Sequence, residues 1–100
     1  MENQFHAIIN ANKPVLVDFY ATWCGPCQML LPVLKQVKDN LGERITILKI
    51  DTDKNHDLAN KYNVRGVPTM ILFKNGKQLW RQSGLLTKEQ ILGNIIKESN

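Results

Sequence analysis

The chain has 100 residues, enough for one domain with a single packed core, and we treat residues 1–100 as that domain. Its composition is 43% hydrophobic and 22% charged with little Gly or Pro, which excludes disordered and fibrous proteins. The net charge of +4 comes from basic residues spread along the chain, and such a spread argues against a nucleic-acid-binding patch.

The N-terminal segment begins with an amphipathic pattern. Residues 4–10 place apolar side chains on one helical face and predict a short helix. Residues 15–20 are then almost all apolar and rich in β-forming types, which predicts a strand buried on both faces. Asp18 is the one charged residue of that strand.

The middle of the chain continues the alternation. Apolar residues at spacings of three and four predict a long helix that starts after Cys24 and ends at Gly42. Residues 45–50 predict a second strand. Asn55 is placed to cap a short helix that runs to Tyr62.

The last third predicts a hairpin and a closing helix. Residues 70–73 form the third expected strand, and Asn75-Gly76 is a strong signal for a two-residue turn. A fourth strand is expected over residues 78–83. Thr87 and Gln90 then make a capping box before the last helix.

The predicted order is α-β-α-β-α-β-β-α. Strand–helix–strand units give a right-handed parallel pair, and the hairpin adds an antiparallel strand. We therefore expect an α/β fold in which one mixed sheet is covered by helices on both faces.

Two cysteines, Cys24 and Cys27, open the long helix. At this spacing they share a face of the first turn, with Cα atoms about 5–6 Å apart, so they can form a disulfide. Unpaired N–H groups and the helix dipole stabilise a thiolate there. We expect Cys24 to be the exposed attacking thiol and Cys27 the shielded resolving thiol.

Asp18 lies only six residues before Cys24 in the strand that leads to it. Burial raises the pKa of a carboxyl group, so Asp18 is a candidate proton shuttle for the dithiol. Lys49 in the next strand is a candidate charge partner, although an edge-strand surface lysine is the plainer interpretation.

Other roles for the cysteines fit less well. A zinc site needs about four ligands, and the sequence has no second cysteine pair and no histidines at finger spacing, so we expect no metal. A pair so close in sequence cannot join distant segments, which excludes a small secreted disulfide scaffold. The N-terminal segment has no basic leader, and the sequence has no apolar run of about 18 residues. We therefore expect a cytoplasmic protein with no membrane partner.

At Trp23-Cys24-Gly25-Pro26-Cys27 the sequence resembles the thioredoxin family. The resemblance extends along nearly the whole chain through separate motifs in the right order. These motifs are Val17-Asp18-Phe19, Pro32, Lys49, Gly66-Val67-Pro68-Thr69, Phe73-Lys74-Asn75-Gly76 and Gly84.

The resemblance implies the thioredoxin fold and protein-disulfide reductase activity. It implies that Pro68 is cis and faces the dithiol, and that the Val67 backbone pairs with an extended substrate. Asp18 would help to deprotonate Cys27. The docking groove would be lined by Trp23, Gly25, Pro26, Gly66, Val67, Pro68 and Gly84. No bound cofactor is implied; thioredoxin reductase would supply electrons from NADPH, and the protein would act as a monomer on disulfide-containing proteins.

The sequence departs from the family in two places. Tyr20 stands where the family often has Trp, which affects packing beside the site. The opening helix begins almost at once, so the first strand of the family is missing unless residues 1–4 form it. We therefore expect four strands, or five if it forms, and expect residues 45–50 near an edge of the sheet.

Two other functions stay open at this stage. One is a dedicated thiol donor in an exported pathway, which would need an export signal. The other is an interaction module on the same fold whose cysteine pair is incidental.

Overall fold

We describe the protein from a computed structural model that covers residues 2–100. In chain order the elements are α1 (Glu2–Ile9), β1 (Val15–Tyr20), α2 (Gly25–Leu41), a 3-10 turn η1 (Gly42–Arg44), β2 (Thr46–Asp51), α3 (His56–Lys61), β3 (Thr69–Lys74), β4 (Lys77–Ser83) and α4 (Lys88–Ser99). The order expected from the sequence is confirmed, with η1 as an addition.

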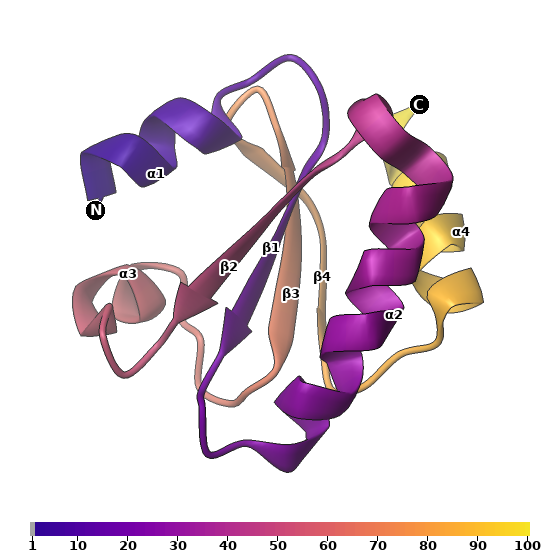
Figure 1. The fold of residues 1–100 in the computed structure, drawn as a ribbon. Helices are drawn as coiled ribbons and strands as arrows, with labels where there is room; N and C mark the ends of the chain where they lie inside the picture. The colour runs from indigo at the N-terminus through magenta and orange to yellow at the C-terminus, as the bar shows by residue number, and fades with distance from the viewer. Residues whose placement is uncertain (1) are drawn as a thin grey trace.

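The four strands form one mixed sheet in the order β2-β1-β3-β4 (Figure 1). β1 pairs in parallel with β2 and antiparallel with β3, and β3 pairs antiparallel with β4. The chain is helical from Glu2, so no strand precedes α1 within the described residues, and Met1 lies outside them. β2 is therefore an edge strand, as the sequence predicted.

Helices cover both faces of the sheet (Figure 1). α2 and α4 pack on one face, where their apolar side chains join Leu16, Met70 and Leu72 in a buried cluster. On the other face, Phe5 of α1 and Leu58 of α3 pack against Val17 and its neighbours. Burial on both faces explains why β1 and β3 are apolar almost throughout.

The chain ends its elements where the sequence predicted. Gly42 follows α2 with φ +56°, a conformation that glycine adopts without strain. Asn75 and Gly76 both have positive φ, as a tight hairpin turn requires. The capping box of Thr87 and Gln90 is complete, because each side chain accepts from the backbone N–H of the other.

The hairpin turn also holds the end of α1. The backbone N–H of Asn75 donates to the carbonyl of Ala11 at 2.9 Å, and that of Gly76 donates to Ile9 at 3.0 Å. These bonds join residues far apart in the sequence. They fix the point where the chain leaves α1 and turns into β1.

One capping prediction is wrong. Asn55 does precede α3, but its side chain makes no capping hydrogen bond to that helix. Its amide instead donates to the carbonyl of Asp51 at 2.9 Å and so closes the turn after β2. None of the helices in residues 2–100 is both long and apolar enough to cross a membrane.

Candidate active site

Cys24 and Cys27 form a disulfide at the N-terminal end of α2, with Cα atoms 5.2 Å apart. The distance agrees with the expected spacing of two residues on one helical turn. Cys24 is the N-cap of α2, and its Sγ accepts a hydrogen bond from the backbone N–H of Cys27 at 3.2 Å. An N–H group aimed at this sulfur stabilises its thiolate once the disulfide is reduced.

The sequence predicted an exposed Cys24 and a shielded Cys27, but the structure buries both cysteines. Cys24 is only 4% exposed and Cys27 1%, so the disulfide lies almost wholly below the surface. Both sulfurs pack with Ala21, and the half-buried side chains of Tyr20 and Val67 pack against them. Cys24 keeps the greater exposure, but the neighbouring loop covers most of it.

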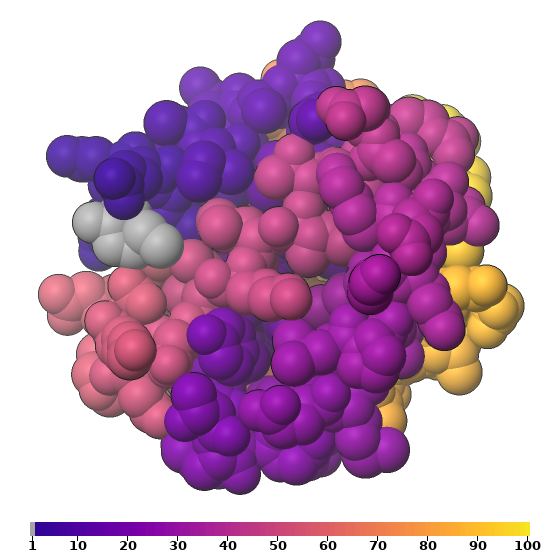
Figure 2. All heavy atoms as spheres, viewed as in Figure 1, coloured from indigo at the N-terminus to yellow at the C-terminus, as the bar shows by residue number. Residues whose placement is uncertain are grey.

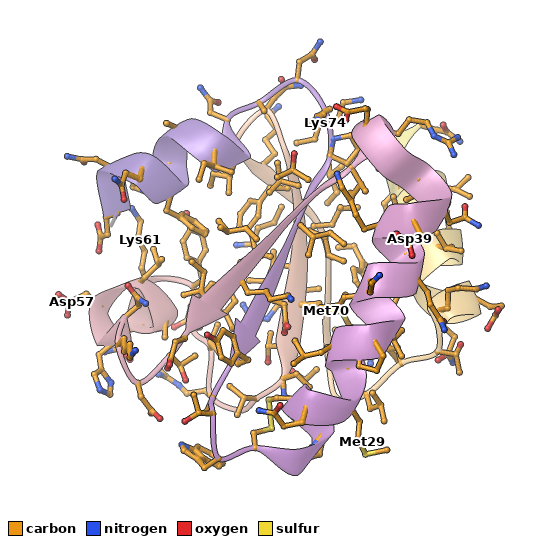
Figure 3. All side chains as sticks on the ribbon, viewed as in Figure 1. Met29, Asp39, Asp57, Lys61, Met70 and Lys74 are labelled. Carbon is orange, nitrogen blue, oxygen red and sulfur yellow. A yellow bond between two sulfur atoms is a disulfide. The ribbon has the colours of Figure 1, made fainter. Side chains whose placement is uncertain are left out.

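Asp18 is fully buried, and neither carboxylate oxygen has a hydrogen-bond partner within the described residues. Side chains alternate along a strand, and Leu16 packs on the α2 face, so Asp18 points to that face as well. Met70, its partner on β3, lies between the sheet and α2 (Figure 3). The carboxyl group therefore lies in an apolar layer beneath the helix that carries the dithiol.

Burial raises the pKa of Asp18 from 3.8 to about 6, and the charge of Lys49 partly offsets this rise. Lys49 lies directly opposite Asp18 in the register of β1 and β2. Its side chain is exposed on the edge strand. Both interpretations of Lys49 from the sequence are thus correct, because it is a surface lysine whose field still reaches the buried carboxyl group.

A loop between α3 and β3 faces the disulfide. The Val67–Pro68 peptide bond is cis, as the family resemblance implied. The carbonyl oxygen of Val67 lies 3.7 Å from Cys24 Sγ. The N–H of Gly84 donates to the carbonyl of Pro68 at 2.9 Å and joins this loop to the end of β4. Val67, Pro68 and Gly84 therefore gather beside the cysteines.

The remaining residues of the predicted docking surface lie around this centre. Trp23 is 73% exposed, and Gly25, Pro26 and Gly66 are exposed as well. The carbonyl of Gly66 accepts from the hydroxyl of Thr69 at 2.7 Å, which fixes the start of the loop. The structure thus places these residues on the surface next to Cys24, while their contact with a substrate stays a prediction.

Two contacts near the site were missed from the sequence. The indole Nε1 of Trp23 donates to Asp53 Oδ2 at 2.8 Å, which holds an exposed ring in one orientation. Arg81 of β4 donates to the carbonyls of Tyr62 and Asn63, just before the loop that carries Val67. The paired residues are 18 to 30 positions apart in the sequence, so no local pattern predicts these contacts.

Residues 2–100 hold no group of three or more His, Cys, Asp or Glu side chains that could bind a metal ion. The groups that the structure brings together at this site are the two sulfurs, the buried Asp18 carboxyl group and the Val67–Pro68 loop. The sequence model of the Thioredoxin family matches residues 1–97. The chain belongs to the thioredoxin family.

Relatives and solved structures agree with the family assignment. Thioredoxin Y1, chloroplastic, from Arabidopsis thaliana is 49% identical over 88 residues, which cover 88% of this chain and 51% of that one. A bifunctional thioredoxin reductase/thioredoxin from Mycobacterium leprae is 42% identical over 91% of this chain, which is 20% of its own length.

A solved structure of a mutant thioredoxin from Halobacterium salinarum superposes with a TM-score of 0.89 at 39% identity, covering 98% of this chain and 85% of that one. The mixed sheet with helices on both faces is thus a thioredoxin fold. The chain spans about half the length of the chloroplastic thioredoxins that it matches.

Proposed function

We propose that this thioredoxin-family chain reduces disulfide bonds in other proteins, with Cys24 as the attacking thiol and Cys27 as the resolving thiol. The observation that carries the proposal is the Cys24–Cys27 disulfide at the N-cap of α2, where the Cys27 N–H donates to Cys24 Sγ. A pair at this place can open and close with little backbone movement.

In the reduced protein, the Cys24 thiolate attacks one sulfur of a substrate disulfide. A new S–S bond forms between Cys24 and the substrate, the substrate disulfide breaks, and the electron pair leaves on the released sulfur. The Cys27 N–H and the first turn of α2 stabilise the thiolate before the attack. The nearby Val67 carbonyl gives the extended substrate a backbone acceptor.

In the second step the thiol of Cys27 loses its proton and attacks Cys24 Sγ. The mixed disulfide breaks, the second substrate thiolate leaves, and the Cys24–Cys27 disulfide forms. Asp18 is suited to accept the proton, because its pKa of about 6 lies close to neutral pH and its oxygens have no other partner within residues 2–100. Lys49 tunes that pKa through its charge.

We propose a thioredoxin reductase, supplied by NADPH, as the source of electrons. The two activities appear together in the name of the bifunctional relative from Mycobacterium leprae, which supports this pairing. Each cycle leaves the Cys24–Cys27 pair as a disulfide, which must take up two electrons before the next cycle. We propose that the chain acts in the cytoplasm, since its two cysteines are the reactive pair and none is left for a structural disulfide, as expected in a reducing compartment. We also propose that it acts as a monomer.

The direct test is the reduction of insulin disulfides by dithiothreitol, followed as turbidity, with and without the protein. We expect clear acceleration by the intact chain and none by Cys24→Ser. A Lys97→Ala variant, altered on the exposed side of α4, is the matched control and should keep full activity. An intact chain that gives no acceleration would rule out the reductase assignment.

The two alternatives can be separated from it by further measurements. A dedicated thiol donor should reduce one partner and leave insulin almost untouched. An interaction module should keep its activity in cells when Cys24 is replaced by serine. Retained cellular activity of Cys24→Ser would therefore favour the module over both redox functions.

A further inference from the structure

The open edge of the sheet has free backbone groups. The N–H of Thr46 donates to the carbonyl of Pro14, and that of Thr52 donates to the carbonyl of Tyr20. The backbone groups of the even-numbered residues of β2 therefore point toward β1. Peptide groups alternate in direction along a strand, so those of Ile47 and Lys49 point away from the sheet. No hydrogen bond in residues 2–100 uses these outward groups. Together they offer the donors and acceptors that an added strand requires.

A cleft of about 570 Å³ lies beside this edge, between β2 and α2. In Figure 1, β2 starts near the end of α2 and crosses in front of β1 toward α3, and Figure 2 shows the surface of these elements from the same side. Leu31 and Ile47 give the cleft a partly apolar lining. An added strand could therefore bond to β2 with its backbone while every second side chain enters the cleft.

The charges around the cleft select the occupant. Three lysines line it, Lys35, Lys38 and Lys49, against a single carboxylate, Asp39. Lys38 donates to the carbonyl of Ile45 at 2.6 Å, so it also closes the N-terminal end of the free edge. A second copy of the chain would place these lysines against each other, and like charges at an interface are unfavourable.

We propose that β2 and the adjacent cleft bind an extended acidic segment of a partner protein, which adds to the sheet as a fifth strand. Every second residue of the segment enters the cleft, where its carboxylate faces Lys35 or Lys49 and its methylene groups contact Leu31. The residues between them point to the opposite face of the sheet. This surface is separate from the docking surface around Cys24, so partner binding and disulfide exchange can occur together.

Binding there also acts on the active site. A carboxylate next to Lys49 weakens the field of that lysine at Asp18, on the opposite strand position. The pKa of Asp18 should then rise further above its usual range, because burial remains and the compensating charge is screened. A partner on the edge would thus change the proton acceptor for Cys27 without covering the dithiol.

The test uses the intact oxidised chain labelled with ¹⁵N and an acetylated peptide of about eight residues that alternates glutamate with valine. We expect chemical-shift changes and slowed hydrogen exchange at the backbone amides of Ile47 and Lys49. A peptide of the same sequence with N-methylated backbone nitrogens should bind far more weakly, since strand addition needs its N–H groups. A peptide with lysine in place of glutamate should not bind.

The charge contribution is tested by a matched pair of variants. Lys35→Glu on the cleft should weaken peptide binding about fivefold, and Lys97→Glu on α4 should leave it unchanged. Two results of the NMR titration would overturn the proposal: no chemical-shift change at millimolar peptide, or changes confined to β4 or to the residues around Cys24. Equal binding of the N-methylated peptide, or equal effects of the two variants on binding, would also overturn it. A concentration-dependent dimer that occupies the edge would also overturn it. None of these outcomes bears on disulfide reduction, which the insulin assay measures alone.

Discussion

Replacing Asp18 by asparagine should make the oxidised protein more stable at neutral pH. A pKa of about 6 in the folded chain, against 3.8 in water, corresponds to about 3 kcal/mol of folding free energy lost at pH 7. The folded state holds the proton more tightly than the unfolded state, so the loss grows as the pH rises from 3.8 through 6. Asparagine has a similar shape and no charge, so the variant avoids this cost.

The assay is chemical unfolding of the oxidised wild type and Asp18→Asn at pH 4 and pH 7. The gain in unfolding free energy should be about 3 kcal/mol at pH 7 and less than about 1 kcal/mol at pH 4. Asp39→Asn, which removes an exposed carboxylate from α2 (Figure 3), is the control and should change stability by no more than about 0.5 kcal/mol.

The same variant should slow the proposed reductase cycle at pH 7, because it removes the carboxylate that we propose as proton acceptor for Cys27. The combination of a more stable and a slower protein is what a buried proton shuttle predicts, whereas damage to the fold would lower both. Equal stability gains at pH 4 and pH 7, or no gain at either, would refute the reasoning.

Three further predictions test other parts of the site. Cys27→Ser should accumulate a mixed disulfide with an oxidised protein substrate, seen on a non-reducing gel, and free substrate alone would contradict its resolving role. Asp53→Ala should release the indole of Trp23 and lower its fluorescence anisotropy. The free energy of unfolding should change by less than about 1 kcal/mol. An unchanged anisotropy would show that the hydrogen bond does not hold the ring. Arg81→Met should lower the unfolding free energy by about 1 kcal/mol in a denaturant titration, since it removes two exposed hydrogen bonds that water only partly replaces. An unchanged midpoint would show that those bonds contribute little.

Local patterns allowed most of the fold to be predicted. The end of α2 at Gly42 and the hairpin at Asn75-Gly76 each depend on a backbone conformation that few residues adopt. The burial of Asp18 followed from its place in an apolar strand that is covered on both faces. Each of these signals lies within a few residues of the feature that it predicts.

The errors have a common physical origin in contacts between distant segments. Cys24 was expected to be exposed because it precedes a helix, but Val67, 43 positions later, covers it. Asn55 had the residue type of a helix cap, yet the carbonyl of Asp51 was a closer partner. The indole bond of Trp23 to Asp53 has the same character. Where a side chain has several possible hydrogen-bond partners nearby, tertiary packing decides which one it uses. A single sequence does not show that packing.

The two hydrogen bonds between the hairpin turn and the end of α1 affect the order in which the chain can assemble. During synthesis α1 leaves the ribosome before its anchors, Asn75 and Gly76, which follow more than 60 residues later. Until then Phe5 has no completed pocket to enter. The final position of α1 therefore depends on a turn that is synthesised much later than the helix itself.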